Sequence, residues 1–121
     1  MSKFVLRKVS SGYKFDLTAA NGQVILSSEV YAARSAALKG IASVRSNAPK
    51  AHVENQTEEG WTLAVNPKFE IYEDRAGEYR FRLKSRNGKI IGVSEGYTAK
   101  AGCLSGVESV MKNAAQAETE E

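Results

Sequence analysis

Residues 4–54 of the chain read FVLRKVSSGYKFDLTAANGQVILSSEVYAARSAALKGIASVRSNAPKAHVE, and residues 69–120 read FEIYEDRAGEYRFRLKSRNGKIIGVSEGYTAKAGCLSGVESVMKNAAQAETE. One extra residue in the second copy, Glu78, keeps the two stretches in register. About 20 of about 51 aligned positions are then identical. Self-similarity at this fixed period indicates two copies of one supersecondary unit.

The chain has 121 residues, of which 42% are hydrophobic and 26% are charged, as is usual for one globular domain. A single repeat of about 50 residues buries too little surface to offset the entropy of ordering its chain. We therefore expect one shared core rather than two independent domains. The repeats are placed at 1–55 and 68–121, with 56–67 as the connecting segment.

Each repeat begins with a pattern typical of β-strands. In the first copy Tyr13, Phe15 and Leu17 alternate with polar residues, which predicts a strand with one buried and one wet face. The pair Asn21-Gly22 then predicts a two-residue type I′ hairpin. The second copy repeats both signals, so each repeat is predicted to start with three antiparallel strands.

A helix is predicted to follow the strands in each copy, because apolar residues return at a period of 3.6. Gly40 and Gly106 lie in the middle of these helices, where glycine costs about 1 kcal/mol relative to alanine, so we expect close approach of each helix to the sheet. Asn47 and Asn113 are expected to end the helices in the left-handed conformation. In the connecting segment, residues 61–65 are predicted to extend the following strand or to pack as an edge.

The shared residues form the pattern F-x-[IL]-…-G-x-Y-x-F-x-L-…-N-G-x-[IV]-I-…-S-E-x-Y-x-A-[RK]-…-L-x-G-[IV]-x-S-V-x-x-N-A, carried by residues 4–48 and again by residues 69–114. This pattern resembles the YegP-like family of small bacterial proteins of unknown function. The resemblance implies an α+β fold of two tandem β3-α-β repeats. They form one antiparallel sheet with two helices on one face, and they exchange their C-terminal strands. The family has no established activity, so the resemblance supplies no catalytic residues to transfer to this chain. No cofactor is expected.

Few residues suited to catalysis or metal binding occur. One histidine, His52, and one cysteine, Cys103, are too few for a structural zinc site. Cys103 belongs to the apolar stripe of its predicted helix, where a small buried side chain is expected. No phosphate-binding loop motif is present. We therefore expect neither an enzyme nor a metalloprotein.

Location and partners are weakly constrained. The N-terminal residues lack the apolar stretch of a secretory signal, so a cytoplasmic location is expected. The net charge of +3 is mild and permits nucleic-acid binding without requiring it. A tandem repeat that completes its own sheet is expected to be a monomer.

Two sets of residues are candidates for a binding site. The first is the repeated Ser-Glu-x-Tyr motif between the third strand and the helix, where a hydroxyl and a carboxylate either satisfy backbone groups or bind a ligand. Its members are Ser28, Glu29, Tyr31, Ser94, Glu95 and Tyr97. The second is a basic strand face beside an aromatic ring, which is typical of single-strand nucleic-acid binding but also of ordinary solvated pairs. Its members are Tyr72, Arg80, Arg82 and Lys84.

These observations favour a non-catalytic interaction module. It would bind an unknown protein or a small ligand through the open sheet face or through the strand–helix corners. Weak single-stranded nucleic-acid binding by the basic face of the second repeat is the alternative.

Overall fold

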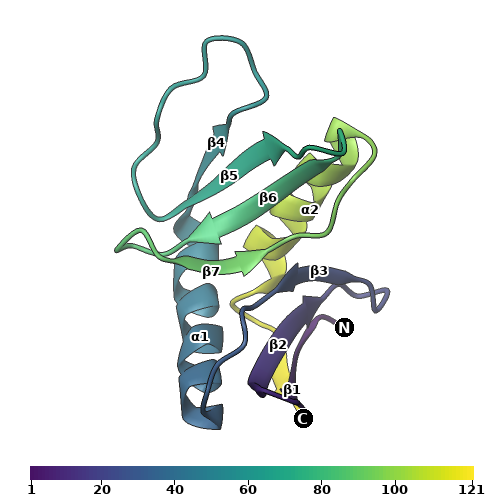
Figure 1. Cartoon of the computed structure of the whole chain (residues 1–121), viewed down its shortest axis with the longest axis vertical. Coiled ribbons are helices and arrows are strands. Elements are labelled where there is room, and N and C mark those ends of the chain that lie inside the picture. Colours follow the sequence, from purple (N-terminus) through teal and green to yellow (C-terminus); the bar gives the residue numbers. More distant parts are fainter.

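Eight strands form a single sheet in the computed structural model, which describes all residues, 1–121 (Figure 1). The strands of the first repeat are β1 (Lys3–Val9), β2 (Gly12–Thr18), β3 (Val24–Ser27) and β4 (His52–Asn55). Those of the second are β5 (Lys68–Glu73), β6 (Tyr79–Lys84), β7 (Ile90–Val93) and β8 (Glu118–Glu120). Helices α1 (Arg34–Asn47) and α2 (Lys100–Asn113) lie on one face of the sheet, and a 3₁₀ turn, η1 (Ala48–Lys50), follows α1. The predicted α+β fold with two β3-α-β repeats is confirmed.

The sheet order is β4-β5-β6-β7-β3-β2-β1-β8, so each repeat completes the sheet of the other. This confirms the expected exchange of C-terminal strands. The six inner strands are antiparallel, but β4 pairs with β5, and β8 with β1, in parallel. The expectation of a wholly antiparallel sheet is thus wrong at both edges. At one of them, the 12-residue connecting segment carries the chain back along the sheet, as a parallel neighbour requires.

The short strand β8 is held by the first repeat. The Arg45 guanidinium of α1 donates hydrogen bonds to Ala117 O at 2.7 Å and to Thr119 Oγ1 at 2.9 Å. It also lies 5.0 Å above the ring of Phe4. Helix α1 therefore fixes a strand that lies about 70 residues further along the chain.

The two hairpins differ in detail from the sequence prediction. A type I′ turn needs positive φ at both central residues, yet only Gly22 (φ 85°) and Gly88 (φ 82°) have it. Instead, the N–H of Ala19 donates to Gln23 O and the N–H of Gly22 donates to Ala19 O. This is a three-residue loop in which glycine takes the left-handed position, and the expected type I′ turn is wrong.

The two repeats contribute to one buried core. A single cluster of 21 buried apolar residues contains side chains from both copies. Equivalent rings pack the same way: Phe4 and Phe15 meet edge-on at 5.9 Å, as Phe69 and Phe81 do at 5.8 Å. The packing of aromatic rings in one half of the core is therefore repeated in the other half.

The helices approach the sheet closely at their central glycines, as predicted. A Cβ atom on Gly40 would lie 2.5 Å from Tyr31 Oη, and one on Gly106 would lie 2.5 Å from Tyr97 Oη. Both helices end without a left-handed residue, so that expectation is wrong. The Nδ2 of Asn47 donates to Ser43 O at 2.8 Å, and Asn113 makes the same bond to Ser109 O. The side-chain amides of these asparagines therefore donate hydrogen bonds to carbonyl groups in the last turn of each helix.

Candidate functional site

The serines of the Ser-Glu-x-Tyr motif hold the strand–helix corners together. The Phe15 N–H donates to Ser28 Oγ at 2.9 Å, and the Ser28 hydroxyl donates to Glu29 O at 2.7 Å. Ser94 repeats this arrangement with Phe81 N–H at 2.9 Å and Glu95 O at 2.8 Å. Both serines are 5% exposed. Their hydroxyls are used within the corner and are not directed at a ligand.

The tyrosines of the motif also belong to the architecture. Tyr31 exchanges two backbone hydrogen bonds of 2.7 Å with Tyr13, and Tyr97 does the same with Tyr79 at 2.8 Å. Each motif ring stacks on a core ring, Tyr31 on Phe15 at 6.2 Å and an interplanar angle of 11°. Burial raises the pKa of the Tyr31 phenol, and the nearby Glu29 carboxylate raises it further.

Glu29 and Glu95 are the exposed members of the motif, and neither carboxylate forms an ion pair. The six motif residues therefore form two corners of the fold rather than one pocket. Of these residues, Tyr31 lines a surface hollow, which it shares with side chains from the other repeat.

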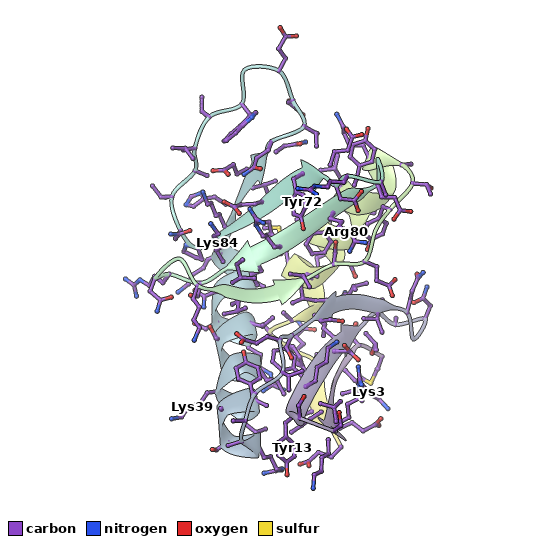
Figure 2. The ribbon with its side chains drawn as sticks, in the orientation of Figure 1. Lys3, Tyr13, Lys39, Tyr72, Arg80 and Lys84 are labelled. Carbon is purple, nitrogen blue, oxygen red and sulfur yellow. The ribbon has the colours of Figure 1, made fainter.

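The basic strand face is assembled as the alternation predicts. Tyr72 of β5 lies opposite Arg80 of β6, on the helix-free face of the sheet. The Arg82 guanidinium lies 4.9 Å above the Tyr72 ring, and Figure 2 shows Tyr72, Arg80 and Lys84 along these two strands. The predicted nucleic-acid-binding residues thus do share one surface.

Each cation on that surface is already paired with a carboxylate. Arg80 Nε lies 2.6 Å from Asp74 Oδ2, and this pairing lowers the pKa of Asp74. Arg82 Nε and Lys84 Nζ lie 2.6 and 3.2 Å from the two carboxylate oxygens of Glu70. A nucleic-acid phosphate would have to displace these carboxylates, which weakens the surface as a phosphate site.

A buried ion network lies beside this face, and the sequence analysis did not identify it. Lys68 Nζ is 2.7 Å from Glu54 Oε1 and 3.3 Å from Glu70 Oε2. The Glu54 side chain is fully buried; it also accepts hydrogen bonds from Ala64 N–H at 2.8 Å and from Gln56 Nε2 at 2.7 Å. Burial alone would raise the pKa of Glu54, but these partners, led by Lys68, lower it to about 2. The network therefore anchors the connecting segment to the sheet.

The connecting segment presents an apolar surface to solvent. Leu63 is 79% exposed, Val65 is 70% exposed and Trp61 is 43% exposed. Residues 61–65 form no strand, and β5 begins at Lys68, so the first of the two expectations for this segment, an extension of β5, is wrong. Trp61 lines a hollow of about 280 Å³ together with Val53 of the edge strand β4. We name Val53, Trp61, Leu63 and Val65 the β4-edge surface.

The remaining chemical groups are structural or isolated. Cys103 is fully buried, as predicted, and burial raises the pKa of its thiol to about 11. No three His, Cys, Asp or Glu side chains lie close enough together to hold a metal ion. Neither helix has the length and apolar character needed to cross a membrane.

Fold and surfaces together define a tandem-repeat α+β protein whose two halves share one sheet. The chain belongs to the family described as Domain of unknown function (DUF1508), whose model matches residues 10–55 and 74–121. The UPF0339 protein YegP of Yersinia pestis is 40% identical over 114 residues, which cover 93% of this chain and 88% of that protein.

Two further comparisons bear on the repeat. The solution structure of the E. coli protein YegP, described as a protein of unknown function, is similar with a TM-score of 0.80 at 33% identity, covering 98% of this chain and 90% of that one. A UPF0339 protein of Treponema denticola is 62% identical over 50 residues, which are 41% of this chain but 86% of that protein. Relatives therefore include two-repeat chains and single-repeat chains.

Proposed function

We propose that this chain is a non-catalytic interaction module that binds an apolar segment of a protein partner at the β4-edge surface. The observation that carries the proposal is the exposure of Leu63 and Val65, at 79% and 70%, in a segment anchored to the sheet. Several exposed apolar side chains within one short, anchored segment are a feature of protein-interaction sites. By contrast, the strand–helix corners use their serine hydroxyls within the fold, and the basic face pairs its cations with carboxylates.

The segment is also available for backbone pairing. The N–H groups of Leu63 and Val65 make no hydrogen bond within the chain, whereas Ala64 N–H is held by Glu54. The anchor fixes the segment while its neighbouring backbone groups remain free. A partner strand that pairs with such groups gains affinity from the backbone and specificity from side chains at alternate positions.

The negative charge beside the β4-edge surface indicates which charge the partner should carry. Glu58 and Glu59 line the same hollow as Trp61, and both are exposed. No cation lines that hollow. We therefore expect the partner segment to carry basic residues beside its apolar ones, because complementary charge speeds encounter and fixes orientation.

A site-specific photocrosslinker at position 63 tests the proposal, with the same group at Leu104, another exposed apolar residue, as the control. A partner captured from position 63 alone is then purified and its affinity is measured. We expect Leu63→Ser/Val65→Ser to weaken that affinity at least about tenfold, and Leu104→Ser to leave it unchanged. Equal capture at both positions, or equal affinity of all variants, would contradict the proposal.

Weak single-stranded nucleic-acid binding is the second candidate, supported by the shared face of Tyr72, Arg80, Arg82 and Lys84. Labelled single-stranded RNA and DNA are titrated by fluorescence anisotropy at about 50 and about 200 mM salt. Binding that falls with salt and is lost in Arg80→Glu/Arg82→Glu would support it. An absence of binding at the lower salt would assign these residues to the solvated ion pairs alone.

A further inference from the structure

Helix α1 and the β6–β7 hairpin are neighbours, one from each repeat (Figure 1). The residues that line the hollows between them form a groove with one wall from each repeat. It consists of two adjoining hollows of about 330 and about 250 Å³. Both hollows are lined by Ser43 of α1 and by Ser85 and Asn87 of the hairpin. A groove of this size suits a small molecule rather than a folded partner.

Three cationic side chains that form no ion pair line the groove. Lys39 and Lys89 line the larger hollow and Arg86 lines the smaller one. None of the three forms an ion pair, in contrast to the cations of the basic sheet face. No aspartate or glutamate lines either hollow. Three like charges beside one concave surface raise the local concentration of anions.

Neutral donors line the same hollows as these cations. Tyr31 Oη has no hydrogen-bond partner within the chain, so its phenol is free to donate; burial raises the pKa of the phenol above its ordinary value. Ser43 Oγ accepts a hydrogen bond from Asn47 Nδ2 at 3.1 Å, which leaves its own proton available for donation. Apolar contact comes from Ala36 and Ile91. Hydroxyl donors flanked by ammonium and guanidinium groups match the acceptor oxygens of a phosphate.

A comparison of the two repeats shows that the fold does not require these cations. At the equivalent positions, Lys39 is replaced by Ser105, Arg86 by Ala20 and Lys89 by Gln23. Both repeats nevertheless keep the stacked tyrosine and the central glycine of the helix that packs against it. The basic character therefore belongs to one groove and is not a consequence of the shared architecture.

We propose that the groove between α1 and the β6–β7 hairpin binds a small phosphorylated molecule. Lys39, Lys89 and Arg86 neutralise its phosphate charge, and Arg86 offers a planar pair of donors that fits phosphate oxygens. Tyr31 and Ser43 donate to the remaining oxygens. The adjacent apolar floor at Ala36 and Ile91 contacts the carbon part of the ligand.

The test is a titration of the full chain with inorganic pyrophosphate, followed by ¹H–¹⁵N NMR. The groove variant is Lys39→Ser/Arg86→Ala/Lys89→Gln, in which each residue becomes the one that the other repeat carries at that position. The matched control is Lys8→Gln/Lys50→Gln/Arg75→Gln, which removes three exposed cations elsewhere that also lack ion pairs. Both variants lower the net charge by the same amount.

We expect saturable shifts confined to residues 31, 36–43 and 85–91, and at least about tenfold weaker binding in the groove variant, with less than about twofold change in the control. Equal weakening in both variants, or shifts spread over all exposed cations, would overturn the proposal as general charge attraction. Absence of saturable shifts would also overturn it. A short single-stranded oligonucleotide forms a parallel arm. If it bound this groove more tightly than both pyrophosphate and a nucleoside monophosphate, the site would belong to nucleic acid instead.

Discussion

The same lysine position has opposite environments in the two halves of the molecule. Lys3 in the first repeat is 46% exposed and pairs with the exposed Glu120. Lys68, its equivalent in the second repeat, is 8% exposed and lies between Glu54 and Glu70. Two features contribute to this difference: Ala64 N–H and Gln56 Nε2 of the connecting segment donate hydrogen bonds to Glu54, and Glu70 has the uncharged Val5 as its counterpart in the first repeat. Buried ion pairs therefore stabilise the β4 edge of the sheet, whereas a solvent-exposed ion pair lies at the β8 edge.

Several residues that are identical in the two repeats make equivalent structural contacts. Ser28 and Ser94 close equivalent corners, and Gly40 and Gly106 admit equivalent tyrosine rings. Residues that differ between the repeats supply the three cations of the basic groove, whereas its hydroxyl donors, Tyr31 and Ser43, have identical counterparts in the second repeat. The charge of the groove is therefore specific to one side of the molecule, although part of its lining belongs to the shared architecture.

The largest expected effect comes from separating the halves. A fragment of residues 1–60 keeps β4 but loses β5, the strand with which β4 pairs. We expect this fragment to be unfolded or to dimerise, with β4 of each copy pairing with β1 of the other. The single-repeat relative in Treponema denticola shows that chains of about this length exist. Circular dichroism with light scattering distinguishes the states, and a folded monomer would refute the requirement for exchange.

Glu54→Gln should have the next largest effect, because it removes a buried charge and leaves Lys68 with one carboxylate fewer. Breaking a buried ion pair from one side costs about 3 kcal/mol in unfolding free energy. The folded pKa of Glu54, about 2, lies below its ordinary value of 4.5. Its contribution is therefore present above about pH 4.5 and is lost as the pH falls toward about 2.

Urea denaturation of both proteins between pH 7 and pH 2 checks this expectation. The difference in unfolding free energy between the natural chain and Glu54→Gln should shrink as the pH falls below about 4.5. A difference that stayed constant over this range would show that Glu54 contributes through packing rather than through its charge.

Most of the fold could be predicted from the sequence, because it rests on local periodicity and on repetition. Alternation in Tyr13, Phe15 and Leu17 placed β2, and the repeat pattern with its family resemblance placed the exchange of β4 and β8. The type I′ turns were wrong because Asn-Gly also fits a three-residue loop, and only the hydrogen bond from Ala19 N–H to Gln23 O decides between them.

The candidate sites were harder to predict, because they depend on contacts between distant residues. Alternation placed Arg82 on the helix-free face, but only the fold shows that Glu70 neutralises it. The basic groove joins Lys39 to Lys89 across two repeats, and no local pattern connects these positions. A position-by-position comparison of the repeats would have provided a signal, since each groove cation has a neutral counterpart.

Ser28→Ala and Ser94→Ala should have smaller and matching effects. Each substitution leaves a buried backbone N–H, that of Phe15 or Phe81, without its acceptor. An unsatisfied buried donor costs about 1–3 kcal/mol, and the equivalent geometry predicts nearly equal losses in urea denaturation. Losses that differed by more than about 1 kcal/mol would show that the corners are not equivalent in energy. Binding of pyrophosphate in the groove should persist in Ser94→Ala, because Ser94 lines neither hollow of the groove.

Lys3→Gln should have the smallest effect, although Lys3 occupies the position of Lys68. Its ammonium group lies 2.8 Å from Glu120 Oε1, yet both side chains are about half exposed, so water and salt screen the attraction. We expect no measurable shift in the urea midpoint, at low or high salt, whereas Lys68→Gln should lower that midpoint clearly because Glu54 and Glu70 lose a buried partner. A comparable loss in Lys3→Gln would mean that β8 depends on this ion pair for its place in the sheet. In that case, the contacts of Arg45 with Ala117 and Thr119 would not be sufficient to hold the strand.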